Sequence, residues 1–220
     1  MRKMILIGAL ALLSTAGIAQ NKINEGTIVY QVEWKLPPQM QQMAAMFPKE
    51  MTVYFKGDSS VTQSKSSMSN SSSIMNSKTE YQRLLLDLPM MSKKLSVIFT
   101  PDDQEQIKEN WPDLALKEET ETKTIAGYTG KKYTVTEKKS STTSEAWFAK
   151  DVDVVPNSLT QFFDKSYGFP LQFNSYQNGM GLNATVKEVK TGPVPKGSFT
   201  ATKDYEEITF AQLMGMMGKK

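Results

Sequence analysis

The sequence predicts a mainly β protein of the α+β class: a strongly curved antiparallel sheet, or open half-barrel, covered by a few short helices. One observation is that short segments alternate apolar and polar residues with the period of two typical of half-buried strands. Another is that turn residues recur between these segments, at Gly57-Asp58, Gly127, Asn178-Gly179 and Gly192-Pro193. Many short antiparallel strands with one apolar face favour a single large curved sheet or an open barrel.

The predicted strands begin near residue 27 and continue to residue 186. In each of them, apolar residues occupy every second position or form a short run with few polar breaks. They cover residues 27–34, 51–56, 84–86, 96–99, 133–135, 146–148, 171–173 and 182–186. The chain shows neither an internal repeat nor a long linker, so we expect one domain over residues 20–220.

Three segments break the strand pattern and predict short helices. The second begins at Thr100, a cap residue followed by Pro101 and two acids, and ends at about Asn110, before Trp111-Pro112. The first, after Pro37-Pro38, and the third, at the C-terminus, carry apolar stripes at helical spacing. These stripes are Met40, Met43, Ala44 and Phe47 in the first helix, and Phe210, Leu213, Met214 and Met217 in the third.

Residues 64–77 form a tract of Ser, Asn, Lys and Met with low sequence complexity. Its many turn residues favour a mobile loop or hairpin. The alternative is a long hairpin at a sheet edge, since strands tolerate Ser and Thr.

The first nineteen residues predict a cleavable signal peptide. Arg2 and Lys3 precede an apolar run over residues 4–13, and Gly17-Ile18-Ala19 places small residues at a cleavage site. Cleavage after Ala19 would leave Gln20 first, and the apolar run is too short to span a bilayer. The chain has no cysteine to lipidate. We therefore expect a periplasmic or secreted protein that does not span a membrane.

Composition argues against several functional classes. The chain has no histidine and no cysteine, which removes Ser-His-Asp and Cys-His nucleophile systems and imidazole or thiolate metal sites. The formal net charge is +3 and falls to about +1 without Arg2 and Lys3, too balanced for a nucleic-acid binder. Carboxylate-based hydrolysis survives as a weaker option, but the acids lie in polar runs such as residues 118–121. We expect a non-enzymatic protein without cofactor or metal.

Three stretches resemble a known family. They are residues 124–133 with 145–151, then Gly168-Phe169-Pro170-Leu171-Gln172-Phe173, and finally Gly192-Pro193-Val194-Pro195 with Phe199 and Asp204-Tyr205. Together they are similar to an uncharacterised group of secreted Gram-negative proteins in the lipoprotein-localisation carrier (LolA/LolB-like) superfamily. The resemblance covers most of residues 25–210 by order of elements, and only residues 124–151 match by motif. It implies an incomplete barrel whose concave apolar side is covered by helices. The sequence offers no counterpart of the polar groups that such carriers use with partner machinery.

The number and distribution of the methionines indicate a binding function. The chain has 14, several of them in the first and third predicted helices, and flexible Met side chains can repack around apolar ligands of varied shape. We expect a binder or carrier of a lipid or other apolar ligand. Its lid or cavity would be lined by Met40, Met43, Met46, Phe47, Phe210 and Leu213.

Two alternatives to this function stay open. The same methionines could simply fill a core, as apolar helix stripes usually do. In that case the protein would be an envelope interaction or structural module with a filled interior, binding a protein partner through its Ser-rich hairpin or an edge strand. A binder predicts a continuous apolar cavity of several hundred cubic ångströms, whereas an interaction module predicts a filled interior.

Overall fold

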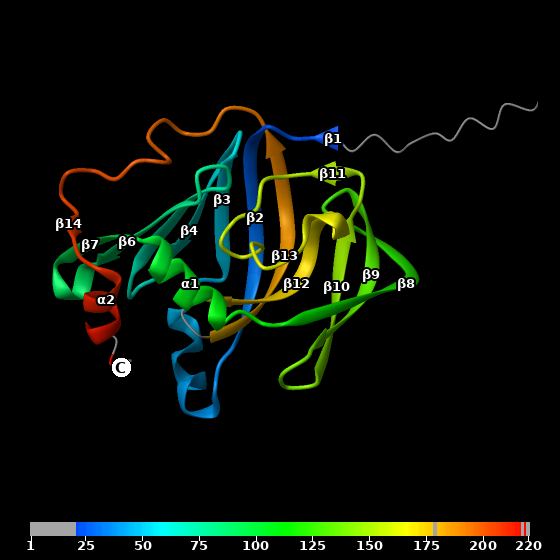
Figure 1. The fold of residues 1–220 in the computed structure, drawn as a ribbon, viewed down its shortest axis with the longest axis horizontal. Helices are drawn as coiled ribbons and strands as arrows, with labels where there is room; N and C mark the ends of the chain where they lie inside the picture. Colours follow the sequence, from blue (N-terminus) through cyan, green and yellow to red (C-terminus); the bar gives the residue numbers. More distant parts are fainter. Residues whose placement is uncertain (1–20, 178–179, 217, 219–220) are drawn as a thin grey trace, which may run out of the picture.

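The computed structural model describes residues 21–177, 180–216 and 218. The predicted signal peptide, the Asn178-Gly179 turn and Met217 lie outside these residues. Over the described ranges, twelve strands form one sheet in the order β14-β7-β6-β5-β4-β3-β2-β13-β12-β10-β9-β8, and β1 and β11 form a separate parallel pair (Figure 1). The mainly β prediction is confirmed. The sheet has two ends, β14 and β8, so it is not closed into a barrel.

The strands of the two sheets have the following bounds: β1 Asn21–Lys22, β2 Glu25–Lys35, β3 Glu50–Lys56, β4 Ser59–Lys65, β5 Asn70–Asn76, β6 Tyr81–Leu88, β7 Lys93–Ile98, β8 Leu114–Ile125, β9 Tyr128–Glu137, β10 Thr142–Ala149, β11 Val152–Asp153, β12 Phe169–Gln177, β13 Met180–Thr191 and β14 Glu206–Glu207. Neighbours in the large sheet are antiparallel except β14 and β7, which are parallel. The prediction of a purely antiparallel sheet is therefore wrong at this edge, because β14 reaches β7 through a long crossing segment.

The Ser-rich tract forms part of a hairpin, as one prediction had it, but this hairpin lies inside the sheet and not at its edge. Residues 59–65 and 70–76 are β4 and β5, and β5 lies inside the sheet between β4 and β6. The turn between them is closed by Ser66, whose hydroxyl accepts from the backbone N–H groups of Met68 and Ser69 at 3.2 and 3.1 Å. Neighbours on both sides satisfy the backbone of β5, so it remains a strand despite its many turn-forming residues.

The predicted helices are present, with one change of type. Helix α1 (Pro101–Glu109) begins with a capping box: Thr100 Oγ1 accepts from the Asp103 N–H at 3.2 Å, and the Asp103 carboxylate accepts from the Thr100 N–H at 2.9 Å. Helix α2 covers Phe210–Met216. The first predicted helix is the 3₁₀ segment η1 (Pro38–Met46). Two shorter 3₁₀ turns, η2 and η3, cover Pro89–Met91 and Lys165–Tyr167.

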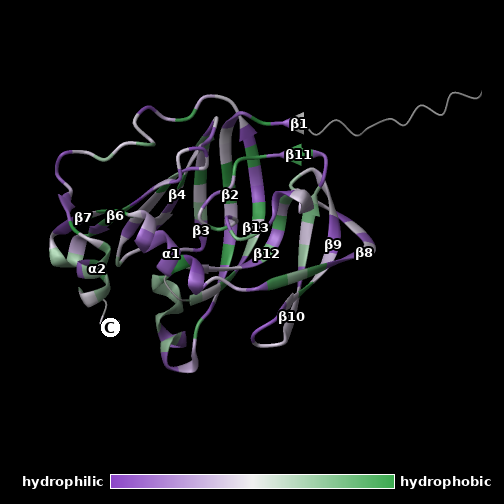
Figure 2. Cartoon of the chain, viewed as in Figure 1, coloured by the Kyte–Doolittle hydropathy of each residue, from purple (hydrophilic) through white to green (hydrophobic). Residues whose placement is uncertain are grey.

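Residues 152–168 pack on one face of the sheet, which we call the inner face (Figure 1). The apolar positions of β2, β3, β10, β12 and β13 point to this face, in the alternation visible in Figure 2. Phe163 lies against Phe148 and Phe173, with ring centroids 5.2 and 5.5 Å apart in edge-to-face geometry. Leu159 is fully buried in the same cluster. The chain itself therefore fills the inner face over these strands.

On the opposite, outer face, the described part of the chain before β14 covers β4, β5 and β6. Val61, Ile74 and Leu85 form a second buried cluster, and Phe199 and Tyr205 of the segment before β14 pack against it. Elsewhere the outer face carries polar residues, such as Gln31, Glu33, Asn183 and Thr185 on β2 and β13. The two faces of the sheet thus bury apolar residues over different strands.

Hydrogen bonds attach residues 152–168 to the sheet. Ser60 Oγ donates to the Pro156 carbonyl at 2.8 Å, and Ser175 Oγ donates to the Leu159 carbonyl at 2.9 Å. Ser60 and Ser175 are both almost completely buried.

We expect Ser175→Ala to lower the free energy of unfolding by about 1–3 kcal/mol, because the Leu159 carbonyl would lose its partner in a dry environment. Urea denaturation followed by circular dichroism measures the change. Exposed Ser67 provides a matched control, and Ser67→Ala should shift the transition by less than about 0.5 kcal/mol. Equal effects of the two substitutions would contradict the assigned role of Ser175.

Candidate apolar binding site

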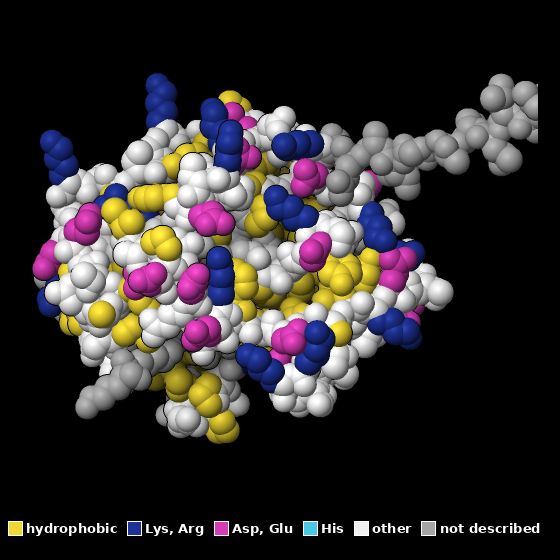
Figure 3. All heavy atoms as spheres, viewed as in Figure 1, with side chains coloured by type: hydrophobic (Ala, Val, Ile, Leu, Met, Phe, Trp, Pro, Cys, Tyr) yellow, Lys and Arg dark blue, Asp and Glu magenta, His cyan; other side chains and the backbone are white. Residues whose placement is uncertain are grey.

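A pocket of about 250 Å³ lies beneath η1, at the end of the sheet where β2 ends and β3 begins. It is lined by η1 and the loop after it, by the β4–β5 hairpin, and by β2, β6 and β13. Eight of the lining residues are apolar and the other four are serines: Trp34, Met40, Met46, Phe47, Pro48, Met68, Leu86 and Met180, with Ser64, Ser66, Ser69 and Ser71. Figure 3 shows hydrophobic side chains gathered on the projecting η1 segment.

Trp34 holds the C-terminal end of η1 against the sheet. Its indole Nε1 donates to the Pro48 carbonyl at 2.8 Å, and its ring lies 5.2 Å from the ring of Phe47. Phe47 is buried and follows the last residue of η1. At the other end, Pro38 occupies the first turn, where a missing N–H costs nothing. The Trp34 contacts fix the C-terminal end of η1, whose own residues are not buried.

The structure brings together three of the six residues predicted to line the site. Met40, Met46 and Phe47 line the pocket. Met40 lies in the first turn of η1 and Met46 is its last residue, so the two reach the pocket from opposite ends of η1. Met43 lies between them in sequence but is 36% exposed and is not a lining residue.

The other two predicted residues lie elsewhere. The Phe210 ring packs against the Phe99 ring at 5.5 Å, and Leu213 is buried where α2 meets β7. Neither residue lines the pocket beneath η1. The six residues expected in a lid or cavity lining therefore do not lie together, because α2 docks at the β7 end of the sheet.

Several lining residues were not predicted from the sequence. Met68 and the serines come from the Ser-rich tract, and Met180 begins β13. Met68 is the one apolar residue between Ser64 and Ser73 in the sequence, and this isolation is a signal that could have identified it. Leu86 and Met180 are ordinary strand residues, and only strand pairing brings them to the pocket.

The pocket has the chemistry of a binding site. None of its lining residues is acidic or basic. Serine hydroxyls can donate or accept hydrogen bonds, but a nucleophilic serine also needs an adjacent base. The lining can therefore surround an apolar group and offer a few hydroxyl contacts.

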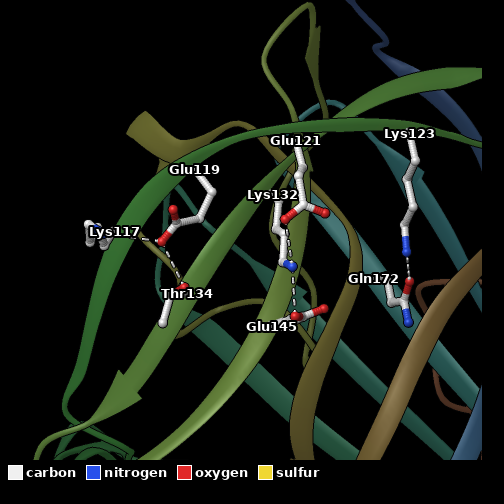
Figure 4. A network of polar contacts seen from close by, with 8 residues as sticks. All are labelled: Lys117, Glu119, Glu121, Lys123, Lys132, Thr134, Glu145 and Gln172. Atoms are coloured by element: carbon white, nitrogen blue, oxygen red, sulfur yellow. Dashed lines mark hydrogen bonds and ion pairs between the residues drawn. The ribbon is translucent and has the colours of Figure 1, made fainter.

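Two networks of charged residues lie on and beside β8, β9 and β10 and share no residue with this pocket. On the outer face, the Lys132 ammonium lies 3.0 Å from the Glu121 carboxylate and 2.7 Å from that of Glu145, linking three strands (Figure 4). Beside it, Lys123 donates to Gln172 Oε1 at 2.6 Å and lies 4.1 Å from the centroid of the Trp147 ring. The side chains of Glu121 and Glu145 are each more than 60% exposed. These contacts form an ion-pair ladder across neighbouring strands.

A second charged cluster centres on Glu118. Its carboxylate pairs with Lys131, accepts from Lys150 Nζ at 2.5 Å, and accepts from the Tyr133 hydroxyl at 2.6 Å. These partners, Lys131 first, lower the pKa of Glu118 to about 2 from an ordinary value of 4.5. Over the described ranges, no group of acids is arranged to hold a metal ion, and no helix is long and apolar enough to cross a membrane.

We expect the Glu118 cluster to make stability depend on pH. A carboxyl whose pKa is lowered by folding stabilises the folded state fully above its unfolded pKa, and this contribution disappears as pH falls towards about 2. The urea midpoint of the native protein should therefore fall between about pH 5 and pH 2, and it should fall less in Glu118→Gln. Denaturation curves at several pH values test this.

The control for this measurement is Glu206→Gln, on the exposed β14 at the opposite edge. It should retain the native dependence on pH. If the urea midpoint of Glu118→Gln depended on pH as that of the native protein does, the proposed contribution of this cluster would be contradicted.

Comparisons with known proteins show a shared fold alone. A solved structure of PNGF-II in space group P21 superposes with a TM-score of 0.51 and 15% sequence identity, covering 89% of this chain and 34% of PNGF-II. This chain thus corresponds to about a third of the length of PNGF-II. No protein-family model matches the chain, and no curated protein sequence matches it.

Proposed function

We propose that the protein is a periplasmic or secreted, non-enzymatic binder or carrier of an apolar ligand. In this proposal residues 1–19 are a cleaved signal peptide. Residues 20–220 form one domain with the strongly curved, half-barrel sheet of the lipoprotein-localisation carriers. The ligand site is the pocket beneath η1. The observation that carries the proposal is that Met40, Met46 and Phe47, selected from the sequence, line one pocket that contains no charged residue.

The volume of the pocket limits the size of the ligand. Sites for drug-sized molecules enclose about 300–1,000 Å³, and the pocket encloses about 250 Å³. It therefore suits a short apolar chain, or the end of a longer acyl chain, and not a whole lipid. Burying about eight methylenes yields roughly 6 kcal/mol before the costs of association. Such a ligand would bind weakly and leave readily, as a carrier requires.

The wall formed by η1 suits a ligand that enters and leaves. A nine-residue 3₁₀ helix is long for its type, and its hydrogen-bond geometry is poorer than that of an α-helix. Met40, Met46 and Met68 are unbranched and can change rotamer around a chain of varied shape. The Trp34 contacts hold only one end of η1, so the methionine-bearing part can move separately from the sheet.

We expect Met46→Asp to abolish binding of decanoic acid, because a carboxylate in the pocket would be desolvated and would repel the fatty acid. Isothermal titration calorimetry on the mature protein, stripped of lipid by denaturation and refolding, measures the affinity. The control Met216→Asp changes a methionine that is 48% exposed on α2 and should bind as the native protein does. Equal binding by both variants, or none by the native protein, would exclude this site.

A second function is favoured by a different observation. Residues 152–168 fill the inner face, and Met90 and Met91 of η2 are 81% and 56% exposed. Both features suit an envelope interaction or structural module that binds a protein partner.

Native mass spectrometry of protein purified from the periplasm distinguishes the two functions. A co-purified lipid supports the carrier. A clean apo mass, with no thermal shift on adding fatty acids or phospholipids, supports the module.

A further inference from the structure

Strands β10 and β12 are neighbours in the sheet but pair over only one end. Their pairing covers residues 147–149 of β10 and 169–172 of β12, with a register shift after Trp147. In contrast, β10 pairs with β9 along residues 142–148, and β12 pairs with β13 along residues 172–177. Residues 142–146 and 173–177 therefore each have one unpaired edge, and the two strands diverge between them (Figure 1).

The two unpaired edges border one pocket of about 260 Å³, which we call the β10–β12 slit. Thr142, Thr143 and Ser144 line it from β10, and Asn174 and Tyr176 line it from β12. Phe162 and Phe163 line its inner side. The slit shares no lining residue with the pocket beneath η1.

The slit presents two rows of backbone hydrogen-bonding groups. Among the described residues, no backbone-to-backbone hydrogen bond reaches residues 142–146 or 173–177 from outside the ladders with β9 and β13. Donors and acceptors repeat along both edges at strand spacing, and an extended polypeptide is the ligand that matches such a repeat on both sides.

The outermost strands of the sheet are protected against such pairing more fully than the slit is. Strand β8 carries Lys117, Glu119 and Glu121 and has an irregular register between Glu118 and Thr122. At the other end, β14 has two residues. Charges, bulges and short strands are the devices that prevent edge-to-edge pairing. On the β10 edge of the slit, Glu145 is the one charged residue among residues 142–146, and the charged lining residues Lys35 and Glu137 come from β2 and β9.

We propose that the β10–β12 slit binds an extended segment of a partner protein, about five residues long, by adding a strand between β10 and β12. Alternate side chains of that segment would contact Phe162 and Phe163 and are therefore apolar. The others would lie on the outer face beside Lys35, whose ammonium donates to Asn174 Oδ1 at 3.0 Å. On this face Lys35 lies beside the β12 edge and Glu145 lies on the β10 edge, so polar, uncharged side chains fit these positions. This site is independent of the apolar-ligand proposal.

The test uses a fluorescein-labelled heptapeptide of alternating valine and threonine. A matched peptide carries N-methyl groups on alternate amides, which keeps the side chains but removes the donors on one edge. Fluorescence anisotropy measures binding to the mature protein, and amide hydrogen exchange locates it. We expect only the unmethylated peptide to bind, with slower exchange in residues 142–146 and 173–177.

Two lysine substitutions distinguish peptide binding in the slit from binding elsewhere on the sheet. Thr143→Lys places a charge on the unpaired edge and should weaken peptide binding at least about tenfold. Thr124→Lys makes the same change at an exposed threonine of β8 and should not alter binding. Met46→Asp should also leave peptide binding unchanged. Thr143 is exposed, and equal urea midpoints for the two lysine variants would show that folding is intact.

Three results would overturn the proposal. The methylated peptide could bind as tightly as the unmethylated one. Exchange could slow outside the two segments, or nowhere. The protein could form a dimer that Thr143→Lys dissociates, which would identify a second copy of this chain as the occupant in place of a separate partner.

Discussion

The packing of residues 152–168 against the inner face is the constraint on which the rest of the structure depends. A twelve-stranded open sheet without disulfides must bury its apolar face with its own chain. Phe163 and Leu159 do this over β2, β10, β12 and β13, and Ser60 and Ser175 fix the segment by hydrogen bonds to its carbonyls. Phe162 and Phe163 of this segment border the β10–β12 slit, whereas the pocket beneath η1 is lined by other parts of the chain.

The two proposed sites differ in the kind of recognition that each would provide. The pocket beneath η1 lacks charge and is walled by flexible methionines, so its recognition would be non-directional and weak. The β10–β12 slit lacks a strand, so its recognition would be directional and would depend on the register of the occupant. A protein with both could hold an apolar ligand while bound to a partner, since the sites share no residue.

The ion pairs on β8, β9 and β10 have a structural role. The Lys132 ladder and the Glu118 cluster tie β8, β9 and β10 together at the end of the sheet where β10 leaves β12. Exposed ion pairs contribute little individually, but a strand that has lost one neighbour gains from cross-strand pairs with the other. The same charges keep the outer edge of β8 from pairing with other chains.

The sequence by itself determined which segments alternate with a period of two, where α1 begins and ends, and which methionines follow Pro38 at helical spacing. These are local properties, because side-chain period and capping act over a few residues. Tertiary structure alone decided that the Ser-rich tract is an interior strand, that the polar segment over residues 114–125 is the edge strand β8, and that α2 lies apart from η1. It also decided where β10 and β12 separate. Each of these depends on which strand lies beside which, and backbone pairing between strands is largely indifferent to the polarity of their side chains.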